Sequence, residues 1–207
     1  MKVIILNGSP RTNGNTFTAL KEVERVLNQQ GIETEFIHVG HKPIHGCISC
    51  NKCWDTGECQ MGDLVNEISK KMEECSGIVV GSPVYFASGN GALISLLDRL
   101  FYSNLTHDWS MKVGATVAVA RRGGTTATMD QLNKYFLMTN MPVVPSQYWN
   151  IVHGCDPGDV VKDEEGMQTM RQMALNMAFM MKSFELGMKE FGSPKIQEEP
   201  SQTNFIR

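Results

Sequence analysis

The sequence has no excess of basic residues and no long hydrophobic run. Its 19 Lys and Arg residues are outnumbered by 22 Asp and Glu residues, which gives a formal net charge of -3 at pH 7. This balance provides no electrostatic basis for binding nucleic acid or an anionic membrane surface. No apolar stretch approaches the roughly 20 residues that span a bilayer. We therefore expect a protein that binds neither nucleic acid nor membranes.

We also expect no secretory signal, because the chain enters an apolar, strand-like run at Val3 almost at once. We therefore expect a cytoplasmic protein. Thiols stay reduced in the cytoplasm. The six cysteines are accordingly expected to be free, metal-bound or redox-active rather than paired in structural disulfides.

Several catalytic motifs are absent as well. The sequence shows neither a Ser-His-Asp pattern nor His-Glu-x-x-His, so hydrolase chemistry has no support. The first loop has neither the Lys of a Walker A motif nor the G-x-G-x-x-G spacing of a dinucleotide fold. No side chain is marked as a general acid, and we assign no catalytic residue.

The most informative stretch that is present lies at the N-terminus. The apolar run 3–6 leads through a loop rich in Gly, Ser, Thr and Asn (7–15) into a segment with helical spacing. Unpaired N–H groups and the helix dipole favour an anion at such a helix start. Further donors and positive charge can come from Ser9, Arg11, Thr12, Asn15 and Thr16. We interpret the loop as a site for one terminal phosphate; an ordinary strand–helix connection with N-cap residues is the alternative.

Apolar segments alternate with helical ones along the chain. Strands are expected at 3–6, 33–39, 77–81 and 113–120, with a fifth beginning at 142–144 and 148–152 as its continuation or a short edge strand. Helices are expected at 20–27, 64–72, 93–101, 125–138 and 164–191. This alternation predicts an α/β fold with a parallel sheet covered on both faces, whose ligands bind at the carboxyl ends of the strands. We expect one domain over 1–192, with a cysteine loop at 44–62, and a polar tail at 193–207.

The loops after the first, third and fourth expected strands read Gly8-Ser9-Pro10-Arg11 with 13–16, then Gly81-Ser82-Pro83-Val84-Tyr85-Phe86, then Arg121-Arg122-Gly123-Gly124. In this order they resemble the flavodoxin-like NAD(P)H-dependent FMN reductase family. The resemblance implies a flavodoxin-like three-layer sandwich whose five-stranded parallel sheet has the order 2-1-3-4-5, with FMN at the switch between strands one and three. It also implies an oxidoreductase that passes electrons from NADH or NADPH through FMN to a small-molecule or protein acceptor.

The family's residue roles carry over to matching positions. The resemblance places the FMN phosphate against Ser9, Arg11, Asn13, Asn15 and Thr16. It places the ribityl chain and the ring along Pro83, Val84, Tyr85 and Phe86, and the other edge of the ring at Arg121, Gly123 and Gly124. A flavin needs an apolar wall, and amides where negative charge grows on reduction. Core packing is the alternative for the two aromatic residues.

Four cysteines gather in one short stretch: Cys47, Cys50, Cys53 and Cys59. Within the family this stretch resembles the iron-sulfur flavoproteins. Three thiolates at two-residue gaps, with a fourth nearby, suit a [4Fe–4S] cluster, whereas zinc sites more often separate two cysteine pairs by a long gap. The spacing leaves three possibilities open: a cluster, bare or redox-active thiols, and zinc.

Two other functions remain open. One is an iron-sulfur flavoprotein that acts as a non-enzymatic electron carrier between FMN, a [4Fe–4S] cluster and a ferredoxin-like partner. The other is a redox-responsive protein that senses oxidants through its thiols. The long Met-rich helix expected at 164–191 offers apolar surface, so we expect a homodimer or a higher homo-oligomer.

Overall fold

The computed structural model describes residues 1–104, 107–194, 198, 201, 203 and 205. Its centre is a parallel sheet in the order β2-β1-β3-β4-β5. The strands are β1 Lys2–Asn7, β2 Glu33–His38, β3 Gly77–Pro83, β4 Val113–Ala120 and β5 Ile151–His153. This confirms the expected fold class and strand order. The winding direction switches between β1 and β3, which is where this fold places its ligand.

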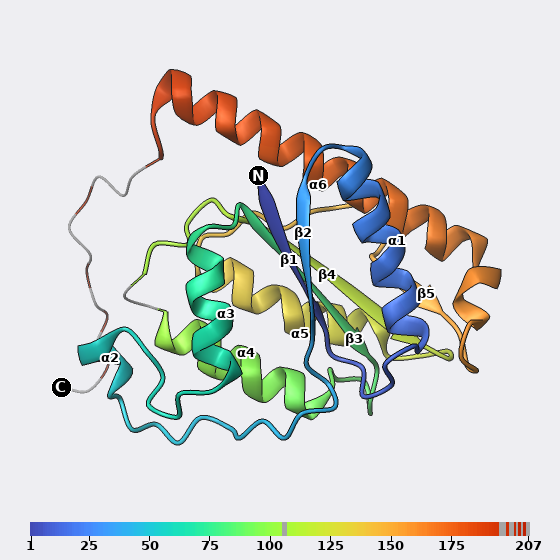
Figure 1. Cartoon of the computed structure of the whole chain (residues 1–207), viewed down its shortest axis with the longest axis horizontal. Helices are drawn as coiled ribbons and strands as arrows, with labels where there is room; N and C mark the ends of the chain where they lie inside the picture. The colour runs from blue at the N-terminus through green and yellow to red at the C-terminus, as the bar shows by residue number, and fades with distance from the viewer. Residues whose placement is uncertain (105–106, 195–197, 199–200, 202, 204, 206–207) are drawn as a thin grey trace.

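Helices cover both faces of the sheet (Figure 1). One layer consists of α1 (Asn15–Gln29) and α6 (Glu164–Phe191), and the other of α3 (Leu64–Glu73), α4 (Gly91–Ser103) and α5 (Thr125–Met138). Alternation along a strand explains the two cores: Val3 and Ile5 of β1 pack toward the first layer, Ile4 and Leu6 toward the second. None of the helices in the described part of the chain combines the length and hydrophobicity needed to cross a bilayer.

The fifth strand differs from the sequence prediction. Val143 forms only an isolated parallel bridge with Gly114, and the chain rejoins the sheet as β5, which begins at Ile151. Pro145 explains the interruption, because proline has no N–H to donate to a ladder. The structure also adds a short helix, α2 (Cys53–Thr56), and a 3₁₀ helix over Asp159–Lys162. Most of the expected tail at 193–207 lies outside the described residues.

The methionines of α6 fill the core. Met170, Met173, Met177 and Met181 are almost fully buried against the sheet and α1. Unbranched, polarisable side chains suit such irregular gaps. The exposed side of the helix instead carries Leu175, Phe179 and Leu186, which are 40, 73 and 67% exposed.

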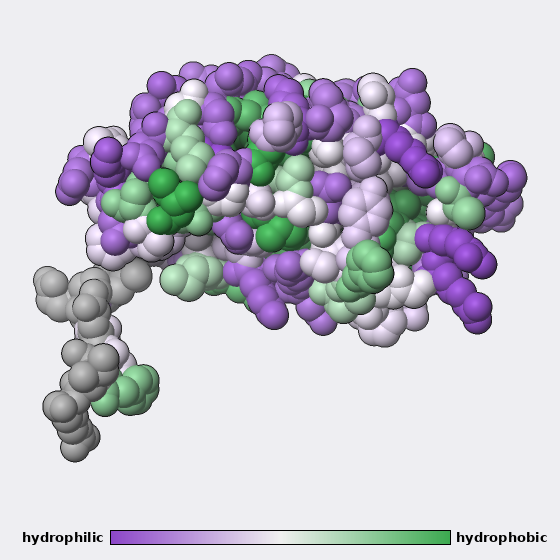
Figure 2. All heavy atoms as spheres, turned by 90° about the horizontal axis from the view of Figure 1, so that it is seen from below, coloured by the Kyte–Doolittle hydropathy of each residue, from purple (hydrophilic) through white to green (hydrophobic). Residues whose placement is uncertain are grey.

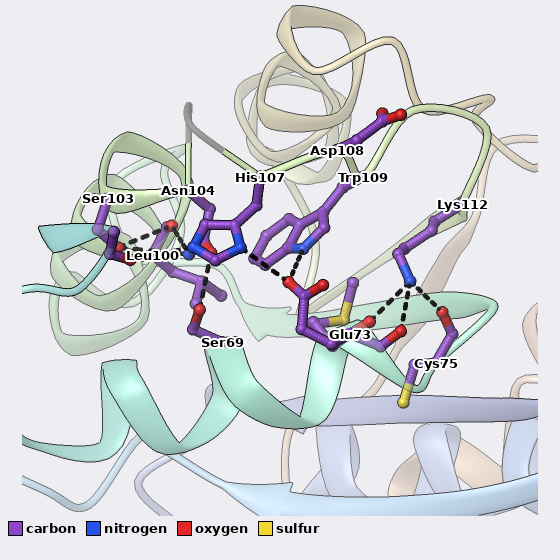
Figure 3. Close-up of polar contacts among 12 residues, drawn as sticks. Ser69, Glu73, Cys75, Leu100, Ser103, Asn104, His107, Asp108, Trp109 and Lys112 are labelled. Carbon is purple, nitrogen blue, oxygen red and sulfur yellow. Dashed lines mark hydrogen bonds and ion pairs between the residues drawn. The ribbon is translucent and has the colours of Figure 1, made fainter. Parts of the chain in front are cut away.

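A lysine secures the carboxyl end of α3 (Figure 3). The Nζ atom of Lys112 donates to the carbonyl oxygens of Met72, Glu73 and Cys75, at 2.8, 3.2 and 2.7 Å. Burial lowers the pKa of this ammonium group. Its charge complements the negative end of the helix dipole, and its donors satisfy carbonyls that the helix leaves unpaired. Lys112 therefore ties α3 to the start of β4.

Replacing Lys112 with Met should lower the free energy of unfolding by about 1–3 kcal/mol, because three carbonyls lose a charged donor. Chemical denaturation of the purified protein measures this change. Lys182→Met is the control, because Lys182 is an exposed lysine on α6. Equal stability of the two variants would contradict the capping role of Lys112.

Candidate functional site: loops at the carboxyl edge of the sheet

The loops after β1, β2 and β3 are packed together at the carboxyl edge. The N–H of Gly8 donates to the carbonyl oxygen of Gly81 at 2.8 Å, which joins the loop after β1 to the end of β3. Gly40 follows β2 and lies directly against the first loop: a Cβ atom on Gly40 would be 2.1 Å from the carbonyl oxygen of Gly8. Only glycine fits there, so the loop is held at a fixed position above the switch point.

The loop after β1 is folded by its own polar groups. Asn7 Oδ1 accepts the N–H of Ser9 at 3.0 Å, and Ser9 Oγ accepts the N–H of Arg11 at 3.1 Å. Gly14 is the N-cap of α1, and among the residues described no side chain caps this helix start. The first turn of α1 also carries no acidic residue. Its N–H groups and dipole are thus available for an anion such as a phosphate.

The side chain of Asn15 forms hydrogen bonds within the protein that the sequence does not predict. Its Nδ2 donates to the carbonyl oxygen of Asp156 at 3.0 Å, while its Oδ1 accepts the N–H groups of Gly158 and Val160 at 3.1 and 3.3 Å. The side chain therefore ties the start of α1 to the loop after β5. The predicted phosphate contact from Asn15 stays a prediction, because its backbone N–H and the second hydrogen of Nδ2 have no partner among the described residues. The exposed side chains of Arg11 and Asn13 remain placed for the predicted phosphate role.

Replacing Asn15 with Ala should destabilise the protein without FMN by about 1–3 kcal/mol, because buried backbone groups lose their partners. Denaturant titration of the apoprotein measures this loss. Asn13→Ala is the matched control in the same loop, because Asn13 is exposed. An Asn15→Ala apoprotein as stable as the wild type would mean that the side chain serves the ligand and not the loop.

The loop after β3 makes a tight, strained turn. Tyr85 and Ser88 exchange two backbone hydrogen bonds, at 2.9 and 3.0 Å. The two residues between them, Phe86 and Ala87, have φ angles of 51° and 59°. Residues other than glycine rarely adopt this left-handed backbone region, and such strain concentrates at functional sites. The turn leaves Tyr85 45% exposed and the Phe86 ring fully exposed, which excludes core packing for Phe86.

The turn after β3 is supported from α5 and from the loop after β4. Gln131 Oε1 accepts the Ser88 hydroxyl at 2.8 Å and the Gly89 N–H at 3.0 Å. Gly124 has a φ of 89°, and a Cβ atom there would be 2.9 Å from the Cα of Ala87. The loop after β4 thus packs against the turn after β3. Three residues of the loop after β4 are exposed: Arg121, Arg122 and Gly123. The structure brings all three predicted flavin loops to one edge of the sheet.

The four cysteines of the 44–62 loop line one pocket, whose empty space is about 340 Å³ when open solvent is included. Cys53, at the start of α2, is buried, and burial raises the pKa of its thiol; Cys47 and Cys50 are exposed. No group of three His, Cys, Asp or Glu side chains in the described residues is arranged to hold a single metal ion. A cubane needs a wider arrangement, because each cysteine binds a different iron atom.

A second groove runs from Cys47 of the cysteine loop along α4 and α5. It encloses about 1020 Å³, including open solvent, between α4 and α5, and both Cys47 and Gln131 line it. Gln131 also holds the turn after β3. Seen from below, the surface shows hydrophobic residues in separate patches among hydrophilic ones (Figure 2). Cys47 and Gln131 therefore line the same groove, and Gln131 links that groove to the turn after β3.

Sequence reasoning did not identify four residues that shape these sites: Gly40, Arg99, Asn15 in its structural role, and Gln131. Arg99 did leave a signal, because it is a charged residue within the apolar run 93–101. The partners of Gly40 and Gln131 are distant in sequence, so no local pattern could reveal them.

A parallel sheet in the 2-1-3-4-5 order, with an uncapped helix start at its switch point, defines a flavodoxin-like fold with a helix end open to an anion. Comparison with protein families is more specific. Residues 1–156 match the model described as NADPH-dependent FMN reductase, and the chain belongs to this family. Flavin oxidoreductase or flavin-dependent electron carrier is therefore its general class.

Two curated relatives are named iron-sulfur flavoproteins. One, from Methanocaldococcus jannaschii, is 39% identical over 189 residues, covering 88% of this chain and 98% of that protein. The other, from Methanosarcina thermophila, is 28% identical over 177 residues, covering 84% of this chain and 92% of that protein. This chain therefore spans nearly the whole length of both relatives.

Solved structures agree on the fold. A crystal structure of RosB with a bound riboflavin-5'-phosphate intermediate has a TM-score of 0.70 at 15% identity and covers 100% of this chain and 92% of that chain. FerB from Paracoccus denitrificans, a flavoenzyme NAD(P)H:(acceptor) oxidoreductase, has a TM-score of 0.65 at 15% identity, with 88 and 97% covered. At these identities the likeness establishes the flavodoxin-like architecture.

Proposed function

We propose that this protein binds FMN and a [4Fe–4S] cluster and carries electrons from NADH or NADPH to a small-molecule or protein acceptor. The observation that carries the proposal is that four cysteines line one pocket in a chain of the FMN reductase family. Cys47 also lines a groove with Gln131, which hydrogen-bonds the turn after β3. The relatives that are named iron-sulfur flavoproteins support the same pairing of cofactors.

The loop after β1 fits the phosphate of FMN. The uncapped start of α1 supplies N–H groups, and Arg11 and Asn13 are exposed beside it. Ser9 and Thr16 are both buried. Ser9 Oγ also holds the loop in shape through the Arg11 N–H, which preorganises the loop before the ligand arrives.

The loops after β3 and β4 fit the flavin ring. FMN, when bound, accepts a hydride from the reduced nicotinamide and passes the electrons on. Val84 and Tyr85 offer an apolar wall, which the strained turn and Gln131 keep in place. Arg121 and Arg122 are exposed next to that turn, where positive charge would favour a reduced, anionic ring or a nicotinamide phosphate.

The cysteine pocket fits an iron-sulfur cluster by its donor set. Four thiols from one short loop surround it, and such thiolates select iron-sulfur clusters or zinc. The cluster, when bound, handles electrons singly. Cys53 anchors the set from the buried start of α2, while Cys47 also lines the groove between α4 and α5.

An anaerobic absorption spectrum, with iron, sulfide and flavin assayed on the same sample, tests the proposal. We expect one FMN and about four iron atoms per chain, and bleaching of the flavin band when NADPH or NADH is added. Flavin with no iron would reduce the proposal to a plain FMN reductase with free thiols. No flavin after incubation with FMN would overturn it.

A non-enzymatic electron carrier is the second candidate, favoured by the relatives named iron-sulfur flavoproteins. Stopped-flow reduction separates the two functions. An enzyme should be reduced by NADPH or NADH at a rate that depends on Arg121 and Arg122. A carrier should react slowly with both nucleotides and rapidly with a reduced ferredoxin. In a carrier, the double variant R121A/R122A should leave nicotinamide reduction unchanged.

We further propose that the protein forms a homodimer or a higher homo-oligomer in the cytoplasm. The support comes from the exposed side of α6, where Phe179 and Leu186 are more than two-thirds exposed. Light scattering of the holoprotein tests the assembly, and a monodisperse monomer would contradict it.

A further inference from the structure

Arg99 is a buried cation in the wall of the cysteine pocket. It lies on α4 and is 2% exposed, and it lines the pocket together with Cys47, Cys50, Cys53 and Cys59. A buried charge is costly unless it is paired and hydrogen-bonded. The groups that pair with the Arg99 guanidinium therefore indicate its role.

Every N–H group of the Arg99 guanidinium has an acceptor. Nη1 and Nη2 each donate to one carboxylate oxygen of Asp63 at 2.8 Å, a bidentate pair. Nε and Nη2 donate to Cys59 Sγ at 3.3 and 3.2 Å, and Nη1 donates to the carbonyl oxygen of His45 at 3.3 Å. Five donors in a rigid fork match five contacts, which lysine could not reproduce.

Cys59 is held by α3 as well as by Arg99 of α4. Asn66 of α3 accepts the N–H of Cys59 at 3.0 Å and donates to its carbonyl oxygen at 2.9 Å. Asp63 is the N-cap of α3 and accepts the N–H of Val65 at 3.1 Å. Burial disfavours the Asp63 carboxylate, but Arg99 and this N–H outweigh burial and hold the pKa of Asp63 below its usual range. Both members of the pair are therefore charged.

We propose that Arg99 and Asp63 are positioning residues that set the reduction potential of a [4Fe–4S] cluster bound through Cys59. This inference rests on the proposed function and names the residues that set the reduction potential of its cluster. Reduction adds one electron to the cluster and neither forms nor breaks a bond, so its negative charge increases. Two N–H donors and a positive charge at Cys59 Sγ favour the reduced state, and the Asp63 carboxylate limits that effect.

The two partners should act in opposite directions. Arg99→Gln removes the positive charge and leaves Asp63, so the potential should fall. Asp63→Asn keeps the donors of Arg99 and removes the negative charge, so the potential should rise. We expect each shift to change the reduced-to-oxidised ratio at a fixed ambient potential about tenfold, which is about 59 mV for a one-electron couple. A purely structural ion pair would not give shifts of opposite sign, because both variants break the same contact.

Anaerobic redox titration of the holoprotein, followed by electron paramagnetic resonance of the reduced cluster, measures these shifts. Arg171→Gln is the control, because Arg171 pairs with Glu22 in the other helix layer and should leave the potential unchanged. Arg99→Lys retains the charge but not the fork; it should fold where Arg99→Gln fails, and should lower the potential by a smaller amount.

Opposite shifts in Arg99→Gln, or Arg99→Lys, and Asp63→Asn would establish the inference. Iron-loaded variants with unchanged potentials, or with shifts of the same sign, would overturn it and leave the proposed function intact. A wild-type protein that holds no iron after reconstitution would overturn the cluster itself and this inference with it.

Discussion

Replacing Cys53 with Ser should remove most of the iron from the protein, from about four atoms per chain to well under one, and leave the FMN content unchanged. Cys53 is the buried member of the four cysteines that line the pocket. A serine hydroxyl is not ionised at neutral pH and binds iron weakly compared with a thiolate. Iron and sulfide assays on anaerobically purified protein, with flavin measured on the same sample, give both quantities.

Cys75→Ala is the matched control for this loss. Cys75 is also buried, but it belongs to the hydrophobic core at the end of α3, outside the cysteine pocket. Its replacement should leave the iron content unchanged. If both variants lost iron to the same degree, the loss would reflect general destabilisation. If Cys53→Ser kept its iron, the four cysteines would not be the ligand set.

Replacing Gly40 with Ala should weaken FMN binding about tenfold or more, which corresponds to at least ~1.4 kcal/mol. The added Cβ would lie 2.1 Å from the carbonyl oxygen of Gly8 and 2.4 Å from the carbonyl carbon of Ser9. Both contacts are with backbone, so no side-chain rotation relieves them, and the loop after β1 must shift. Overpacking of this kind costs about 1–3 kcal/mol in stability as well. Fluorescence titration of apoprotein with FMN measures the affinity.

Gly46→Ala is the control for Gly40. Gly46 lies six residues further along the same connection, and no described atom is within 4 Å of a Cβ built there. Its variant should bind FMN like the wild type. Normal FMN affinity in Gly40→Ala would mean that the loop after β1 tolerates displacement, and would argue against its role in holding the phosphate.

Most elements were predictable because they follow from local patterns, whereas the strand order was implied by the family resemblance. Strand β4 was expected at 113–120 and occurs at those residues, because an unbroken apolar run suits a strand buried on both faces. The fifth strand was placed too early. Its sequence has a Pro on each side of Val143 and Val144, and only the three-dimensional arrangement decides which short segment pairs with β4.

The sequence by itself determined which loops lie at the ends of the strands and predicted that they carry the chemistry. Gly-rich and cysteine-rich segments at the ends of apolar runs are local signals, and the topology brings the ends of parallel strands to one edge. The tertiary structure alone decided how these loops are held. The side chain of Asn15, which the sequence predicts as a ligand contact, hydrogen-bonds the loop after β5. Arg99 of α4 donates a hydrogen bond to Cys59, 40 residues away in the sequence. Such roles depend on contacts between distant segments, which form only when the helices pack on the sheet.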